Sequence, residues 1–223
     1  MRFAQISDVH IYNTTRHKEY ALVFTNLIII LKKLKPDRIV ITGDIFHLRT
    51  ILSPESIVLC TLFFRELASI APVDVISGNH DVIVSNKDRM NPLRIIIDQQ
   101  NSWGVPHPVT LYEESKMYKI DEKFSYGVFS ITDEENYPPK IKNDKNINIA
   151  LYHGQIDGSK SSTDYTLESK ITMDLFQDFD FGFFGDIHRP QGFIKTEHVV
   201  EEEIDEAQLE VYKKIYPDIK VLS

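Results

Sequence analysis

The chain has 223 residues, of which 42% are hydrophobic and 26% charged, enough to bury a sizeable core as one large domain or as one domain with a small extension. The formal net charge of −8 argues against binding a polyanion by bulk electrostatics, although bound cations would invert the local field around acidic residues. The single cysteine, Cys60, excludes an intrachain disulfide and a cysteine metal site.

The longest apolar run, Leu27 to Leu31, is far too short to span a bilayer. The N-terminus passes directly into a strand-like segment, residues 2–7, without the pattern of a signal peptide. We therefore expect a cytoplasmic protein with no membrane partner, or a protein of the host cytoplasm if the chain is viral.

The first eighty or so residues alternate short apolar strands with amphipathic helices. Strands are expected at residues 2–7, 38–42 and 73–76, and helices at residues 19–35 and 53–71. Pro36 ends the first helix, whereas Ser53 and Pro54 supply the cap and the first turn of the second. These three βα units predict a parallel sheet covered by helices.

The remainder of the chain is richer in strands. A helix is expected at residues 91–100, and a helical segment at residues 172–179. Short strand candidates separated by polar turns, at residues 109–112, 117–120 and 126–131, predict a second, more antiparallel sheet. Two further apolar runs, residues 147–152 and 181–184, are also read as strands.

The stretch from Val73 to Asp81 is the clearest sign of a site. Its apolar strand runs into Gly78, which we expect to relieve a tight turn, and then into three polar residues that a ligand should reach: Asn79, His80 and Asp81. A plain polar turn is the alternative, so partners from other segments must decide the matter.

Such partners follow other predicted strands. Asp8 and His10 share one side of an extended segment, which is metal-ligand spacing, although a helix cap and a partly exposed histidine would also explain them. Asp44 follows Gly43 after the second strand. Because parallel strands end at one edge of a sheet, Asp8, Asp44 and Asn79 should lie side by side. Two later strands end in His153-Gly154 and Gly185-Asp186-Ile187-His188.

In this order, the five strand-end motifs resemble those of the calcineurin-like metallophosphoesterases, over roughly residues 1–190. Within that superfamily, residues 43–47 (Gly-Asp-Ile-Phe-His) and 16–20 (Arg-His-Lys-Glu-Tyr) are most similar to the Mre11/SbcD-type DNA-repair nucleases, particularly phage recombination endonuclease subunits. The resemblance implies an α/β fold: a four-layer α/β-β/α sandwich of two mixed sheets flanked by helices.

The resemblance also implies a role for each motif residue. Asp8, His10 and His188 would hold one metal ion. Asn79, His153 and Asp186 would hold the other, and Asp44 would bridge the two. His80 would be the general acid facing the scissile phosphate, with His47 in a supporting catalytic role.

Two divalent cations in such a site share a hydroxide, lower its pKa and neutralise charge during in-line attack. The mixed nitrogen and oxygen ligands favour Mn²⁺, with Mg²⁺, Fe²⁺ or Zn²⁺ as alternatives. Asp186 stands where the family usually has histidine, which makes its site harder if it coordinates. The alternative is that Asp186 lies outside the coordination sphere and the second metal is held weakly.

The resemblance predicts a catalytic domain over residues 1–200, followed by a C-terminal helical extension at residues 201–223, with the DNA-capping domain absent or truncated. DNA is the expected partner, and a homodimer and a Rad50/SbcC-type ATPase are further candidates, although the ATPase-docking segment is missing or truncated here. The leading function is a two-metal DNA nuclease acting in double-strand break repair or recombination. A phosphodiesterase or phosphatase for a small substrate and a non-catalytic interaction domain are the alternatives.

Overall fold

The computed structural model describes residues 1–48, 51–86, 89–138, 145–161 and 163–188. The predicted domain boundary at residue 200 and the predicted extension, residues 201–223, lie outside these described residues. Within them, no helix combines the length and the apolar character that a membrane crossing requires.

The first sheet consists of four parallel strands in the order β1-β2-β3-β4. They are β1 (Phe3–Ile6), β2 (Arg38–Thr42), β3 (Val73–Ile76) and β4 (Val109–Tyr112). Ala4 pairs with Ile39, and Ile39 pairs with Val73, so the carboxyl ends of the strands lie at one edge. All four residues of β3 are buried, as expected for a parallel strand that is covered on both faces.

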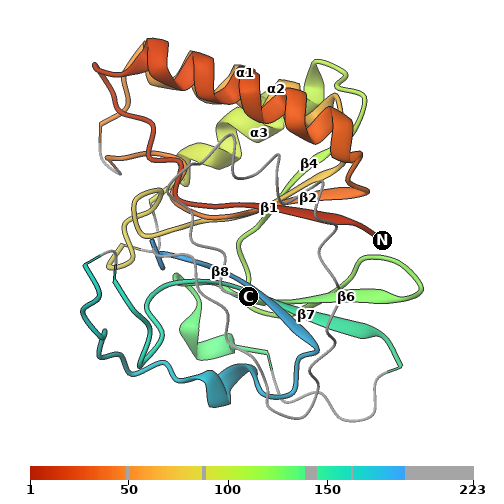
Figure 1. Cartoon of the computed structure of the whole chain (residues 1–223), viewed down its shortest axis with the longest axis vertical. Helices are drawn as coiled ribbons and strands as arrows, with labels where there is room; N and C mark the ends of the chain where they lie inside the picture. The colour runs from red at the N-terminus through yellow and green to blue at the C-terminus, as the bar shows by residue number, and fades with distance from the viewer. Residues whose placement is uncertain (49–50, 87–88, 139–144, 162, 189–223) are drawn as a thin grey trace. The chain divides into compact units, whose positions relative to one another are not determined.

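Three helices cover one face of this sheet (Figure 1): α1 (His17–Leu34), α2 (Pro54–Ala68) and α3 (Pro92–Ser102). The predicted start of α2 is confirmed, because Ser53 Oγ accepts the Ser56 N–H at 3.1 Å and Pro54 begins the helix. The helices bury one continuous apolar cluster against the sheet, and the thiol of Cys60 lies fully inside it.

The second sheet has the order β5-β6-β7-β8. Its strands are β5 (Met117–Lys119), β6 (Phe124–Phe129), β7 (Ile147–His153) and β8 (Phe181–Gly185). Of these described strands, β5 alone runs antiparallel to its neighbour, and β6, β7 and β8 are parallel.

The second sheet is the more antiparallel of the two, as expected, but the expectation that it includes residues 109–112 is wrong. Those residues form β4 and extend the first sheet, because α3 supplies the crossover that parallel pairing with β3 requires. Residues 130–146 and 154–180 likewise exceed the dozen or so residues that a parallel crossover needs. The length of the connecting segments, rather than the shortness of the strands and the polar turns between them, decided that these strands pair in parallel.

The predicted α/β class, two sheets with flanking helices, is confirmed. The first sheet is parallel throughout its described strands, and the second is mixed. Two short 3-10 helices, η1 (Glu134–Asn136) and η2 (Met173–Phe176), accompany the second sheet, and η2 is what remains of the helix predicted at residues 172–179. Phe176 of η2 packs on Phe129 and Phe184, with ring centroids 4.9 Å away in both pairs.

The two sheets pack face to face through a second apolar cluster, to which Val40 of β2 and Val128 of β6 contribute. A buried ionic network lies beside it. The carboxylate of Asp74 in β3 accepts hydrogen bonds from Arg38 Nε at 2.6 Å and Nη2 at 2.7 Å, and from the Tyr126 hydroxyl of the second sheet at 2.9 Å. This network connects the two sheets. Their carboxyl edges lie side by side.

Candidate metal centre

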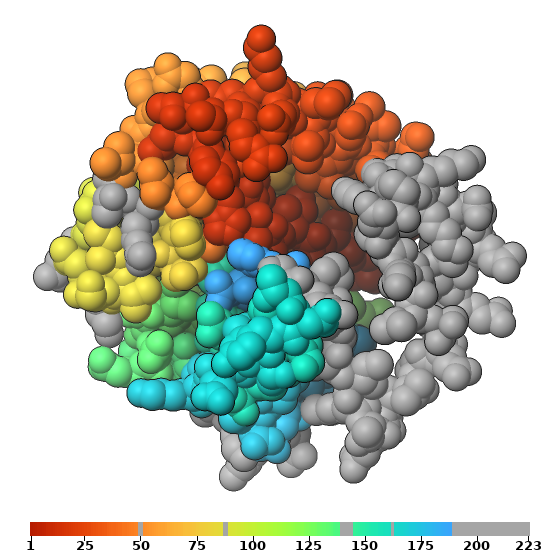
Figure 2. Space-filling model, turned by 60° about the vertical axis from the view of Figure 1, so that its left-hand side comes forward, coloured from red at the N-terminus to blue at the C-terminus, as the bar shows by residue number. Residues whose placement is uncertain are grey.

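Five strand ends meet at the carboxyl edges of the two sheets. Their polar side chains are Asp8 and His10 after β1, Asp44 after β2, Asn79 after β3, His153 at the end of β7, and Asp186 and His188 after β8. The Asp186 N–H lies 3.2 Å from both carboxylate oxygens of Asp8, which joins the two ends of the described chain. Figure 2 views this edge, where the blue residues that follow β8 lie against red N-terminal residues and cyan residues that follow β7.

Four of these residues have a left-handed backbone, with φ values of 55° for Asp8, 50° for His10, 56° for Asp44 and 70° for Asp186. Non-glycine residues rarely adopt this conformation, which costs about 1–3 kcal/mol each and is concentrated at functional sites. The other described non-glycine residues with positive φ are Arg16, Lys35 and Asp164. Backbone strain therefore gathers where the predicted ligands lie.

Close packing of the backbone explains the glycines of the motifs. A Cβ atom on Gly78 would lie 2.1 Å from Asp44 Oδ1, and one on Gly185 would lie 2.1 Å from the Thr42 carbonyl oxygen. The reason for Gly78 thus differs from the predicted one. It does not take a positive φ, and its missing side chain lets the Asp44 carboxylate approach β3.

A first group of ligand atoms comes from Asp8, His10 and His188, one atom of each lying within 4.8 Å of the others. His188 Nε2 is 3.6 Å from Asp8 Oδ1, and His10 Nε2 is 3.9 Å from the same oxygen. Ligand atoms held about 2.0–2.2 Å from one cation lie up to about 4 Å from each other. The group therefore has the dimensions of a single cation site.

The ring of His10 tests whether a cation fits there. Both of its nitrogens are buried, and neither has a hydrogen-bond partner among the described residues. Buried polar atoms without partners are rare because the loss of hydration costs about 1–3 kcal/mol. A metal ion bound by His10 removes that penalty, so the donor set fits the predicted first metal.

A second group gathers around Asp44 and His153, which are both almost fully buried. His153 Nε2 lies 3.3 Å from Asp44 Oδ1, and its Nδ1–H donates to the Thr42 carbonyl at 2.7 Å. A histidine that donates one nitrogen to a backbone carbonyl presents the other as a metal ligand in a fixed orientation. The amide of Asn79 completes the group, with one terminal atom 3.2 Å from His153 Nε2 and from each Asp44 oxygen.

Charge in this group favours a cation. Burial lowers the pKa of His153, but the hydrogen bond and charge of Asp44 outweigh burial and raise it to about 9. Burial alone would raise the pKa of Asp44, yet the contacts with His153 and the backbone N–H of His80 bring it below its usual value. Positive charge is therefore stabilised beside Asp44, at the point where a metal ion would bind.

Asp8 lies between the two groups. Its carboxylate also falls within 4.8 Å of the ligand atoms of Asp44 and His153. The prediction gave the bridging position to Asp44 alone, whereas the structure places Asp8 in both groups. His10 Nε2 lies 3.6 Å from Asp44 Oδ2, so the two groups form one continuous cluster.

Asp186 lies further from its predicted partners. Its Oδ1 is 4.0 Å from His153 Nε2, and it belongs to none of the three ligand groups found among the described residues. Burial raises the pKa of Asp186, and the charges of Asp44 and Asp8 add to that effect. Its coordination of the second metal stays a prediction.

His80 and His47 face the cluster but belong to neither of the two ligand groups described above. His80 donates its Nδ1–H to the carbonyl of His47 at 2.7 Å, which leaves Nε2 as its free nitrogen. The backbone N–H of His80 donates to Asp44 Oδ1 at 2.8 Å. One contact thus orients the ring of His80, and the other holds its backbone beside the predicted bridging ligand.

Asp81 is not available to a ligand, which corrects the expectation that all three polar residues after Gly78 face one. It is only 1% exposed, and its two carboxylate oxygens accept the N–H groups of Phe46 at 3.0 Å and Gly78 at 2.9 Å. Burial raises the pKa of Asp81 to about 6. Asp81 therefore ties the loop after β3 to the loop after β2.

Sequence reasoning missed two tyrosines that contribute to the site. Tyr12 stacks on His47 with ring centroids 4.0 Å apart, and the hydroxyl of Tyr20 donates to the carbonyl of His10. The guanidinium of Arg16 also lies over the Tyr12 ring, 5.9 Å from its centroid. The sequence did show aromatic residues in the polar segment that precedes and begins a helix. Their stacking, however, depends on tertiary contacts.

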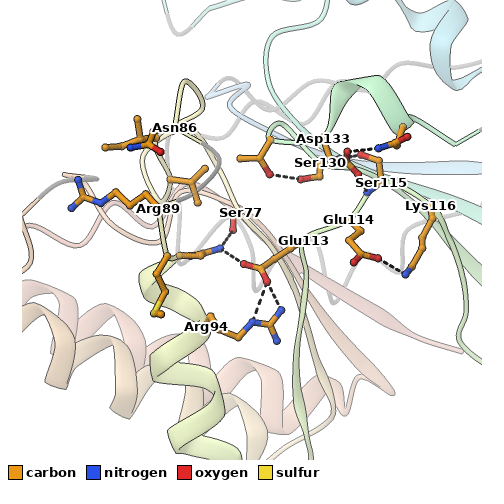
Figure 3. A pocket seen from close by; sticks show the side chains of 16 residues that line it. Ser77, Asn86, Arg89, Arg94, Glu113, Glu114, Ser115, Lys116, Ser130 and Asp133 are labelled. Atoms are coloured by element: carbon orange, nitrogen blue, oxygen red, sulfur yellow. Dashed lines mark hydrogen bonds and ion pairs between the residues drawn. The ribbon is translucent and has the colours of Figure 1, made fainter.

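Two hollows lie at the carboxyl edge. One of about 530 Å³ borders the ligand cluster and is lined by His10, His47 and His80 together with Tyr12 and Arg16. A larger one of about 910 Å³ begins at Ser77 and extends to the loops after β4 and β6. Figure 3 shows two charge pairs in its lining: Arg94 faces Glu113, and Lys116 faces Glu114. We assign the chemistry to the smaller hollow because it alone borders the ligand groups.

Comparison with known proteins agrees with this geometry. Residues 1–190 match the family described as Calcineurin-like phosphoesterase. The uncharacterized protein R555 of Acanthamoeba polyphaga mimivirus is 35% identical to this chain over 199 residues, which are 83% of this chain but only 14% of that protein. The chain thus corresponds to a small part of this much longer relative.

The crystal structure of Pseudomonas putida nuclease MPE is a more distant match. It is 17% identical, with a TM-score of 0.38, and the match covers 75% of this chain and 68% of that one. At that level, the likeness supports no inference about substrate or reaction.

Proposed function

Because this chain belongs to the calcineurin-like phosphoesterase family, we propose that it is a metal-dependent nuclease that hydrolyses phosphodiester bonds of DNA, in double-strand break repair or recombination. The observation that carries the proposal is the convergence of histidine and aspartate side chains from five strand ends around Asp44, with His80 beside them. Membership of the family supports metal-dependent phosphoester hydrolysis. DNA as the substrate is our proposal.

The protein would hold the two metals with complementary sets of atoms. Asp8, His10 and His188 would hold the first, and Asn79 with His153 would hold the second, with Asp186 as a further predicted ligand. Asp44 joins the sets, since its two oxygens approach His10 and His153 at 3.6 Å and 3.3 Å. When bound, two such cations lower the pKa of water and neutralise charge on the phosphate.

His80 has the geometry of a proton donor to the leaving oxygen. Its Nδ1 is held by the His47 carbonyl, so the proton available to a substrate is carried by Nε2. The His80 ring also lies at 90° to the His10 ring, with centroids 4.9 Å apart, which places it next to a predicted ligand. Histidine suits this task because its unperturbed pKa is near neutrality.

Two features support DNA as the substrate. The site lies at an open loop edge rather than in a closed chamber, and the Arg16 side chain, which is 58% exposed and paired with Glu19 at 2.7 Å, lines its hollow. The resemblance of residues 43–47 and 16–20 to the Mre11/SbcD-type nucleases adds to this. With a net charge of −8, we expect weak and salt-sensitive DNA binding, because each phosphate contact contributes to counterion release.

The second candidate is a phosphodiesterase or phosphatase for a small substrate. The observation that favours it is the hollow itself, whose volume of about 530 Å³ lies in the range of small-molecule sites. Two described cations of the larger hollow, Arg94 and Lys116, are also paired with glutamates rather than left for phosphates.

A salt series on two substrates separates these candidates. The Mn²⁺-loaded chain would be assayed on labelled duplex ends and on a chromogenic phosphodiester from about 50 to 200 mM salt, with His80→Ala as the matched control for contaminating nuclease. We expect His80-dependent DNA cleavage that fades as salt rises. Salt-independent turnover of the chromogenic substrate with no DNA cleavage would overturn the nuclease proposal in favour of the second candidate.

A further inference from the structure

The site contains a third cluster of ligand atoms that the two-metal assignment does not use as a unit. One ring nitrogen from each of His10, His47 and His80 lies within 4.8 Å of the others. The ring centroid of His10 lies 4.9 Å from that of His80 and 5.7 Å from that of His47. The centroids of His47 and His80 are 5.8 Å apart. Of the three, only His10 is a predicted ligand of the metal pair.

These separations match three imidazoles around one tetrahedral ion. Zinc binds histidine nitrogen at about 2.0–2.1 Å, which puts each ring centre about 3 Å from the metal and the ring centres about 5 Å from one another. The observed distances of 4.9, 5.7 and 5.8 Å approach that value without rearrangement of the backbone.

The nitrogens needed for such a site are available. His80 uses Nδ1 to donate to the His47 carbonyl, so Nε2 is free, and a backbone carbonyl that orients a histidine is typical of metal sites. His10 has no hydrogen-bond partner on either nitrogen within the described part of the chain. The ring of His47 stacks on Tyr12, and one of its nitrogens lies within 4.8 Å of nitrogens of His10 and His80.

The ligand chemistry differs from that of the metal pair. Carboxylates contribute to both groups around Asp8 and Asp44, whereas the third cluster is made of imidazoles alone. Imidazole ligands suit Zn²⁺ and Cu²⁺, and a carboxylate-rich set suits Mn²⁺ or Mg²⁺. All three histidines line the hollow of about 530 Å³, so an ion has an entry path from solvent.

We propose that His10, His47 and His80 form an inhibitory zinc site. Zinc bound there would take His10 from the first metal of the pair and occupy the Nε2 with which His80 donates its proton. The inhibition rests on the proposed function, whereas the binding of zinc to three histidines does not. High zinc therefore switches off a site that lower zinc or manganese leaves active.

The binding is tested with Co²⁺, a spectroscopic substitute for Zn²⁺ that shows strong visible bands in tetrahedral nitrogen sites and only weak ones in six-coordinate oxygen-rich sites. The key variant is His47→Phe, which keeps a ring to stack on Tyr12 and removes the nitrogens. His107→Ala is the matched control, because His107 lies at the opposite edge of the first sheet, before β4. We expect the strong bands in the wild type and in His107→Ala, and their loss in His47→Phe.

A second measurement follows Mn²⁺ released from the Mn²⁺-loaded protein, read from the electron paramagnetic resonance signal of the free ion. One equivalent of Zn²⁺ should release about one equivalent of Mn²⁺ from the wild type and from His107→Ala, and clearly less from His47→Phe. Equal release from His47→Phe, or strong Co²⁺ bands that survive in it, would mean that zinc simply replaces manganese among the carboxylates and would overturn the proposal.

These readouts need no DNA substrate. A His47-dependent cobalt spectrum in a protein that cleaves no DNA would retain the zinc site and reject the nuclease. Loss of Mn²⁺-induced thermal stabilisation in His47→Phe would show that the substitution damages the metal pair itself. In that case His47→Gln, which keeps a polar side chain of similar length, repeats the cobalt titration, and bands retained in it overturn the proposal.

Discussion

Two buried aspartates, one in β3 and one in the loop after the neighbouring strand β2, differ in the groups that surround their carboxylates. Asp74 in β3 is 0% exposed and has its own cation, Arg38, as well as hydroxyl donors from Tyr112 and Tyr126. Asp44, directly after β2, is 1% exposed and is surrounded by other acceptors and by histidines. Asp74 therefore has its cation within the protein, whereas the histidines and oxygen atoms around Asp44 are the types of atom that bind an external cation.

The pKa directions agree with this contrast. Burial lowers the pKa of Arg38, but its hydrogen bonds to Asp74 outweigh burial and raise it, so the charge pair is internal and permanent. Around Asp44 the only positive charge that the nearby side chains can supply is a proton on a histidine, and the pKa of His153 is raised for that reason. The first region has its charges paired within the protein, and we predict that a bound cation completes the second.

The largest expected effect comes from making the same substitution at the two aspartates. Asp44→Asn should reduce phosphodiester hydrolysis by more than about 10⁴-fold, because metal ions supply several kcal/mol of transition-state stabilisation and also activate the water. Asp74→Asn should lower stability and leave hydrolysis by the folded fraction within a few-fold of the wild type. Equal losses of activity per folded molecule would break the contrast between the two regions.

The next effect separates the metal ligands from the proton donor. His80→Ala should lose roughly 10²- to 10⁴-fold in rate, the usual contribution of general acid catalysis, while keeping the Mn²⁺ stoichiometry of the wild type. His153→Ala, which removes a buried predicted ligand, should lose Mn²⁺ as well as rate. The measurements are initial rates and bound metal after gel filtration, and metal loss in His80→Ala would make His80 a ligand.

Breaking the internal pair should cost stability rather than chemistry. Arg38→Met leaves the Asp74 carboxylate buried without its cation, which should destabilise the fold by about 3–5 kcal/mol in urea titration. The double variant Arg38→Met/Asp74→Leu should recover part of that loss, because it removes the unpaired charge but leaves the hydroxyls of Tyr112 and Tyr126 without their acceptor. If the double variant were as unstable as the single one, the loss would reflect packing rather than unpaired charge.

The smallest effect is stabilisation by the metal itself. Saturation with Mn²⁺ at about 100 times its dissociation constant should stabilise the fold by about 2.7 kcal/mol, visible as a higher Tm. The Tm of Asp44→Asn should shift much less, and that of Asp74→Asn should shift as much as the wild type does from its own lower starting value. A full shift in Asp44→Asn would place the stabilising ion somewhere other than this cluster.

The candidate site was visible in the sequence because its residues follow strands. A strand ends where apolar residues give way to glycine and polar residues, so Asp8, Asp44 and Asn79 could be placed at one edge from local pattern alone. The structure brings His153 and His188 to the same edge, in contact with Asp44 and Asp8. Their roles as metal ligands stay predictions until metal binding is measured.

Sequence reasoning failed where the outcome depends on the direction in which a side chain points. Asp81 follows His80 directly, yet its carboxylate turns inward to the N–H groups of Phe46 and Gly78 and leaves the site. The stack of Tyr12 on His47 joins two loops that are far apart in the sequence. No local periodicity encodes either contact, because both depend on how the loops after β1, β2 and β3 pack together.

By itself, the sequence determined the strand and helix order, the two-sheet α/β class and the set of polar residues at the strand ends, because apolar periodicity and turn chemistry are local. Tertiary structure alone decided that β4 joins the first sheet, that Asp74 is neutralised by Arg38 and that Asp8 lies in both ligand groups. These outcomes depend on crossover length and on the balance of charges brought together from distant segments. A carboxylate buried beside a guanidinium and one buried beside histidines look the same in a sequence, and only the fold shows which of them needs a cation from outside.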